Sequence, residues 1–112
     1  MDRDQIEKMT REYQVMQEQL QSLAMQKEQF SAQKEELKEA LVEIEKATGK
    51  LYVAVGGVMI EHKKDDAVKN VKEKQETLEM RLSIITKQFD DLSKKEQSLR
   101  TEITAVLKDM KQ

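Results

Sequence analysis

The sequence contains no cysteine, no proline and no tryptophan, and only three of its 112 residues are glycine. Without cysteine, the chain can form no disulfide and offers no thiolate to a metal ion. Aromatic residues make up 4%, and hydrophobic and charged residues each make up 38%, whereas globular domains are nearly half apolar and about a quarter charged. With so few apolar and aromatic residues to form a core, and so few glycine and proline residues to form turns, this chain alone cannot fold as a β-sandwich, a β-barrel or a βαβ enzyme.

Long apolar runs and a strong charge of one sign are also missing. The longest nearly apolar run, Leu51 to Ile60, is ten residues, and a membrane-spanning helix needs about 20. The first residues are charged and lack the apolar segment of a secretory signal. The net charge is only −2, and no segment is a basic patch, which disfavours nucleic acid as a main ligand. We therefore expect a cytoplasmic protein with no membrane and no nucleic-acid partner.

Two long stretches without glycine or proline flank the middle of the chain. In the first stretch, positions alternately three and four residues apart are apolar, with Lys27 and Lys34 as exceptions. The series is Ile6, Met9, Tyr13, Met16, Leu20, Leu23, Lys27, Phe30, Lys34, Leu37, Leu41 and Ile44. A repeat of about 3.5 residues that is sustained over this length is typical of a left-handed coiled coil.

The second stretch has the same repeat, with Gln75 and Glu96 as its polar exceptions. The series is Val68, Val71, Gln75, Leu78, Leu82, Ile85, Phe89, Leu92, Glu96, Leu99, Ile103, Val106 and Met110. If the chain reverses between the stretches, opposed positions sum to 112, from Ile44 with Val68 to Ile6 with Val106. We call these positions the seam. Its polar members either fix the register of the helices or loosen the arm and let it flex.

The chain is thus predicted to be mostly α: a long antiparallel two-helix coiled coil with a single β-hairpin at its elbow. We expect one domain over residues 1–112, with helices over about 4–47 and about 66–111. Asp2 and Asp4 are predicted to cap the first helix, and Gly49 to end it in a left-handed conformation. Asp65 and Asp66 are predicted to cap the second helix.

The hairpin is predicted over residues 51–62, where two β-rich runs flank Gly56-Gly57. Two such runs around a Gly-Gly pair are typical of a two-residue turn. A lone hairpin is marginally stable in water, and an exposed edge recruits another strand. We therefore expect oligomerisation through the apolar face of the hairpin and its turn, namely Leu51, Val53, Val55, Gly56, Gly57, Val58 and Ile60.

Apolar residues also gather near the two termini, at Ile6, Met9, Val106, Leu107 and Met110. They either complete the seam or, because helix ends fray, separate and form a binding tip. Leu107 lies off the seam, and methionine suits contact with varied apolar surfaces. By contrast, the sequence indicates no catalytic, cofactor or metal site. His62 is the single histidine and has no second ligand or nucleophile nearby, and Gly56-Gly57 lacks the spacing of a phosphate loop.

Five segments together resemble a prefoldin subunit of the β class. They are Gln26–Phe30, Glu36–Leu41, the hairpin Leu51–His62, Asp66–Val68 and Lys72–Glu79. The resemblance covers essentially the whole chain, and the hairpin between helices of matched length is its specific part. A single hairpin marks the β class, because α-class subunits resemble this plan with a second hairpin. In its brevity the chain resembles archaeal β-class proteins, and a eukaryotic β-type subunit is the alternative. The sequence departs from many relatives at Val53, where they have lysine.

The resemblance implies a hexamer of two α-class and four β-class subunits that assembles through its hairpins. The family holds unfolded client proteins at the coiled-coil tips without ATP and delivers them to a group II chaperonin. The terminal residues Ile6, Met9, Val106, Leu107 and Met110 would then contact clients. An alternative is a structural spacer or adaptor, whose outer face binds a folded partner through Met25, Met80 and Ile84.

Overall fold

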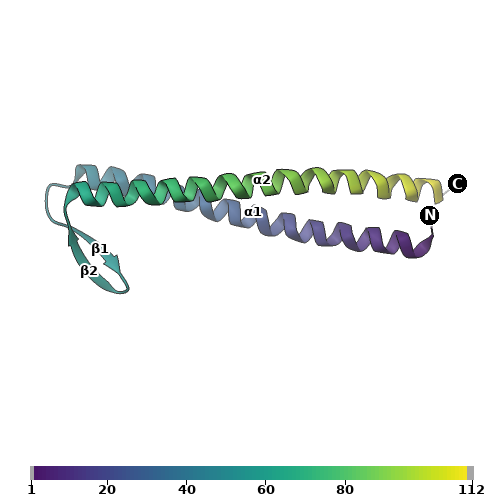
Figure 1. The fold of residues 1–112 in the computed structure, drawn as a ribbon, viewed down its shortest axis with the longest axis horizontal. Coiled ribbons are helices and arrows are strands. Elements are labelled where there is room, and N and C mark those ends of the chain that lie inside the picture. The colour runs from purple at the N-terminus through teal and green to yellow at the C-terminus, as the bar shows by residue number, and fades with distance from the viewer. Residues whose placement is uncertain (1, 111–112) are drawn as a thin grey trace. The chain divides into compact units, whose positions relative to one another are not determined.

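A computed structural model describes residues 2–110. The elements in order are α1 (Arg3–Lys46), β1 (Leu51–Val55), β2 (Val58–His62) and α2 (Lys64–Met110). The hairpin of β1 and β2 connects the end of α1 to the start of α2 (Figure 1). The predicted fold class is confirmed, and the predicted helix limits are correct to within two residues. Lys111, the predicted end of the second helix, lies outside the described residues.

The chain divides into two compact parts. The hairpin part runs from Glu28 to Ser83, and the terminal part comprises the residues up to Lys27 and from Ile84 onward. In the hairpin part, Lys34 Nζ lies 3.8 Å from Glu79 Oε1. In the terminal part, Gln17 Nε2 donates a hydrogen bond of 3.0 Å to Glu96 Oε1. Glu79 is next to Leu78, the predicted partner of Lys34, and Gln17 is next to Met16, the predicted partner of Glu96. Within each part, the helices therefore pair in the antiparallel register expected from the sequence.

The seam forms the core of the helices. The five buried residues among those described are Ala67, Val71, Leu78, Ile85 and Glu96, all in α2. The seam residues of α1 are half-buried, except Lys34, which is exposed. A helix with only one partner is covered from one side, which explains why burial is incomplete.

The start of α1 has the predicted cap. The backbone N–H of Gln5 donates to Asp2 Oδ1 at 2.9 Å, and the backbone N–H of Asp2 donates to Gln5 Oε1 at 3.2 Å. This reciprocal arrangement is a capping box, which satisfies donors that a helix start leaves free. Asp4, also predicted as a cap, instead lies inside the first turn of α1.

Other residues predicted to cap or end a helix do not have that role. Helix α2 begins at Lys64, so Asp65 and Asp66 are not caps but lie in its first turn, where carboxylates interact favourably with the helix dipole. Gly49 does not end α1: the helix stops at Lys46, and Gly49 has no positive φ. The last turn is closed instead by a short-range bond of 3.2 Å from Ala47 N–H to the Ile44 carbonyl.

The hairpin has the predicted register, with Leu51 opposite His62 and Val55 opposite Val58. Gly56 and Gly57 both have positive φ, at 56° and 84°. Positive φ at both central residues is typical of a type I′ turn, whose twist matches that of a two-stranded hairpin. This turn uses glycine because glycine adopts positive φ without steric cost.

Candidate functional site

The apolar face of the hairpin is largely open to solvent in the single chain. Val55 and Val58, which pair across the strands next to the turn, are 55% and 60% exposed, and Ile60 is also exposed. Leu51 and Val53, at the base of the same face, are half-buried. An apolar surface of this kind gains free energy when another apolar surface covers it.

The opposite face of the hairpin carries Tyr52, Ala54, Met59 and Glu61, all exposed. The sheet has only two strands, so each strand pairs along one edge and leaves the backbone groups of the other edge free for a further strand. The hairpin therefore offers two means of association, an apolar face and unpaired strand edges.

The five predicted tip residues all belong to the terminal part. Ile6, Met9 and Val106 are half-buried, whereas Leu107 and Met110 are 46% and 64% exposed. A hollow of about 370 Å³ lies along the first turns of α1, and its lining residues are Ile6, Glu7, Thr10, Arg11 and Gln14. The terminal part thus presents exposed apolar side chains at the end of α2 and a mainly apolar hollow at the start of α1.

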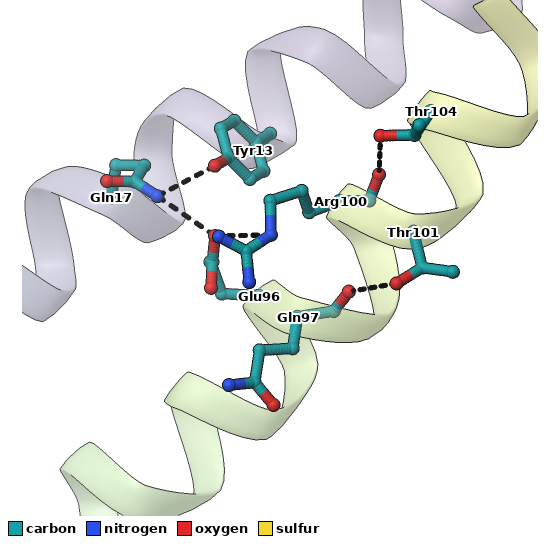
Figure 2. Close-up of polar contacts among 7 residues, drawn as sticks. All are labelled: Tyr13, Gln17, Glu96, Gln97, Arg100, Thr101 and Thr104. Atoms are coloured by element: carbon teal, nitrogen blue, oxygen red, sulfur yellow. Dashed lines mark hydrogen bonds and ion pairs between the residues drawn. The ribbon is translucent and has the colours of Figure 1, made fainter. Parts of the chain in front are cut away.

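A polar cluster interrupts the seam in the terminal part (Figure 2). Gln17 Nε2 donates to Glu96 Oε1 on the other helix and to the hydroxyl oxygen of Tyr13 on its own helix, both at 3.0 Å. Arg100 Nε lies 3.9 Å from the same Glu96 oxygen. These contacts satisfy both amide protons of Gln17 and provide partners for a carboxylate whose side chain is only 7% exposed.

Replacing Gln17 by leucine is expected to lower the free energy of unfolding of the isolated chain by about 1–3 kcal/mol, because it leaves a buried carboxylate without its cross-helix donor. Replacing Gln17 and Glu96 together by leucine is expected to be neutral or stabilising, because the buried carboxylate is removed with its donor and the seam position of Glu96 becomes apolar. Urea unfolding followed by circular dichroism measures both. Gln21→Leu is the matched control, since Gln21 is exposed on the same helix. Equal stability of the Gln17 and Gln21 variants would contradict the assigned role.

The other polar seam residues have simpler surroundings. The Nζ of Lys27 lies 5.7 Å from the centre of the Phe89 ring, a cation–π contact across the helices. Lys34 forms its ion pair with Glu79 while exposed, and such pairs contribute little stability. Gln75 is half-buried. These residues are compatible with the register predicted from the sequence.

Two kinds of site are absent from residues 2–110. No three or more histidine, aspartate or glutamate side chains are grouped so as to hold a metal ion. No helix in this range is long and apolar enough to cross a membrane. The residues proposed for lateral binding, Met25, Met80 and Ile84, are each more than half exposed.

The polar contacts of the structure were not predicted from the sequence. The sequence contains the spacings that underlie this cluster. Gln17 follows Met16, the predicted seam partner of Glu96, and lies four residues after Tyr13. Arg100 lies four residues after Glu96. Lys64, whose Nζ donates to the Glu45 carbonyl at 2.7 Å, was also missed. A lysine in the first turn of a helix opposes the helix dipole, and this unfavourable position is the sequence signal that could have identified it.

Comparison with known proteins gives a consistent result. Residues 7–110 match the family described as "Prefoldin subunit". Prefoldin subunit beta of Methanococcoides burtonii is 42% identical over 53 residues, which is 47% of this chain and 45% of that protein. The chain thus spans less than half the length of this curated relative. The crystal structure of the prefoldin beta subunit from Thermococcus strain KS-1 matches with a TM-score of 0.85 and 35% identity, over 92% of each chain.

Proposed function

This chain belongs to the prefoldin subunit family, with β-subunit architecture, and on that premise we propose that it acts as one subunit of an ATP-independent holding chaperone. The proposed assembly contains two α-class subunits and four copies of this chain. It works in the cytoplasm, holds unfolded client proteins and delivers them to a group II chaperonin. The chain performs no enzymatic step in this scheme, needs no cofactor, and acts as a single domain.

The observation that carries the proposal is the exposed apolar face of the hairpin together with its free strand edges. Burial of a valine or isoleucine side chain contributes about 1.5–3 kcal/mol, and Val55, Val58 and Ile60 all remain exposed in the single chain. In the proposed assembly, hairpins from neighbouring subunits cover this face and extend the sheet, with Leu51, Val53, Gly56 and Gly57 completing the contact.

Client holding is assigned to the terminal part. Leu107 and Met110 are exposed there, and Ile6, Met9 and Val106 are half-buried beside them. One tip offers little area and binds an unfolded segment weakly. Several tips in one assembly raise the effective concentration of the remaining tips once one has bound. Holding of this kind needs no nucleotide, because release follows when the chaperonin competes for the client.

The native mass of the chain, measured alone and after mixing with an α-class prefoldin subunit, tests the proposal. The expected result is a mixed hexamer that contains four copies of this chain, because the apolar hairpin face needs cover from other subunits. A chain that remains a monomer or dimer in both samples would contradict assembly through the hairpin.

The spacer or adaptor is the second candidate, supported by the exposure of Met25, Met80 and Ile84 on the outer faces of the helices. A spacer binds one folded partner, whereas a holding chaperone binds many denatured proteins. Suppression of aggregation of several unrelated denatured proteins therefore favours the chaperone, and binding limited to a single folded protein favours the spacer.

A further inference from the structure

The base of the hairpin is held by a lysine that reaches from one helix to the other. Lys64 is the first residue of α2, and its Nζ donates to the backbone carbonyl of Glu45 at 2.7 Å and to that of Ala47 at 3.5 Å. Both carbonyls lie at the end of α1, where a helix leaves carbonyl oxygens without partners and carries partial negative charge. The ammonium group therefore caps the end of α1 from the start of α2.

The charge of Lys64 is favourable at the end of α1 but unfavourable at the start of its own helix, α2. At the first turn of its own helix, a positive charge is unfavourable, and Asp65 and Asp66 in the same turn offset it. Lys63 precedes the helix, and its carbonyl accepts the Ala67 N–H at 2.9 Å. Within residues 2–110, no hydrogen bond or ion pair engages the Lys63 side chain, so these adjacent lysines differ in whether they join the helix ends.

Little else fixes the hairpin to the helices. A hollow of about 550 Å³ lies at its base, lined by Gly49, Lys50, Glu61, His62, Lys63 and Lys64. A Cβ atom added at Gly49 would meet no atom within 4 Å, so no side chain or backbone packs against this position in the connection from α1 to β1. Within residues 2–110, the Lys64 bonds are the only side-chain hydrogen bonds that join the helix ends at this base.

We propose that Lys64 is a positioning residue for assembly: it fixes the direction in which the hairpin leaves the helices and so presents its apolar face to neighbouring subunits. The hairpin turns out of line with the adjoining helix ends (Figure 1), and the two Lys64 bonds span the base of that turn. This inference rests on the proposed hairpin-mediated assembly. It adds a residue that lies outside the apolar face and acts through orientation rather than burial.

The test compares Lys64→Met, Lys64→Arg and the control Lys63→Met in mixtures with an α-class subunit. Native mass spectrometry over a dilution series gives the concentration of half-assembly. A solvent-exposed hydrogen bond is weak, but a roughly twofold loss in each of four copies compounds to a loss of about tenfold or more in the overall assembly constant, which follows from the half-assembly concentration. Lys64→Met is therefore expected to lower the overall assembly constant about tenfold or more, whereas Lys64→Arg, which keeps the charge, and Lys63→Met remain close to wild type.

Thermal unfolding of the isolated chains separates orientation from stability. The Lys64→Met and Lys63→Met chains are expected to unfold at closely similar temperatures, because the bond is exposed and contributes little to the helices. Lys64→Met assembly at the wild-type concentration would overturn the inference, as would an equal defect in Lys63→Met or no rescue by Lys64→Arg. Failure of the wild-type chain to assemble would instead remove the proposed function itself.

Discussion

A chain in which Val55 is replaced by lysine and Val58 by glutamate is expected to keep its hairpin and lose assembly. Both side chains are more than half exposed in the single chain, so the change removes almost no packing from the isolated subunit. The two residues are directly opposed, and opposite charges at such a cross-strand pair are mildly favourable. In the proposed assembly the same charges would be covered by neighbouring hairpins, where desolvation is costly.

The size of this effect follows from the two lost valine contacts. At about 1.5–3 kcal/mol for each buried valine, the association of each chain should weaken by a factor of about a hundred to ten thousand. Native mass in the presence of an α-class subunit measures it, and circular dichroism of the isolated chain reports whether the helices persist.

The opposite face of the hairpin provides a matched control. Ala54 and Met59 are also directly opposed and exposed, so Ala54→Lys with Met59→Glu places the same charges one residue further along each strand. This variant is expected to assemble. If the Val55 and Val58 variant assembled at the wild-type concentration, the apolar face would not be the interface. If both variants failed, the interface would involve both faces.

Replacing Ile6, Met9, Leu107 and Met110 with serine is expected to abolish the suppression of client aggregation while the mixed hexamer still forms. All four residues belong to the terminal part, whereas the proposed interface lies on the hairpin. Without them the tip presents hydroxyl groups instead of apolar surface, and an unfolded segment gains no free energy from covering it. Light scattering of a denatured client, with and without the assembled variant, gives the readout.

Two further variants separate tip contact from tip folding. Ile6 and Met9 are half-buried in the seam, but Leu107 and Met110 are exposed, so Leu107→Ser with Met110→Ser alters binding with little effect on the helices. This pair is expected to reduce client affinity about tenfold. The control is Val15→Ser with Val42→Ser, since both valines are exposed on α1 outside the proposed tip. Undiminished suppression by the four-serine variant would remove the tip mechanism.

The parts of this structure that depend on period and turn chemistry were predictable from the sequence. Apolar residues at a spacing of 3.5 define which side of each helix is covered, and Val71, Leu78 and Ile85 are buried as the seam requires. Gly56-Gly57 determined both the turn and the strand register, because few other residues accept positive φ at two successive positions.

The contacts of polar side chains were not predictable in the same way. Glu96 was assigned to the seam, but its bond to Gln17 depends on how the two helices are rotated within the terminal part and on the rotamers of long side chains. Gly49 was misassigned because its residue type indicates a helix end, whereas the actual end at Lys46 is determined by the Ala47 and Lys64 hydrogen bonds. The residues expected to bind clients or partner subunits remain predictions that the variants above test.

The antiparallel register also determines the order in which this chain can fold. The contact between Lys64 and Glu45 joins residues 19 apart in sequence, whereas that between Gln17 and Glu96 joins residues 79 apart. Loop-closure entropy rises with separation, so formation of the hairpin first shortens the loops that the later contacts must close. Pairing of α1 with α2 then proceeds from the hairpin toward the termini. During synthesis α1 emerges before α2, so the apolar seam of α1 stays uncovered until α2 has formed.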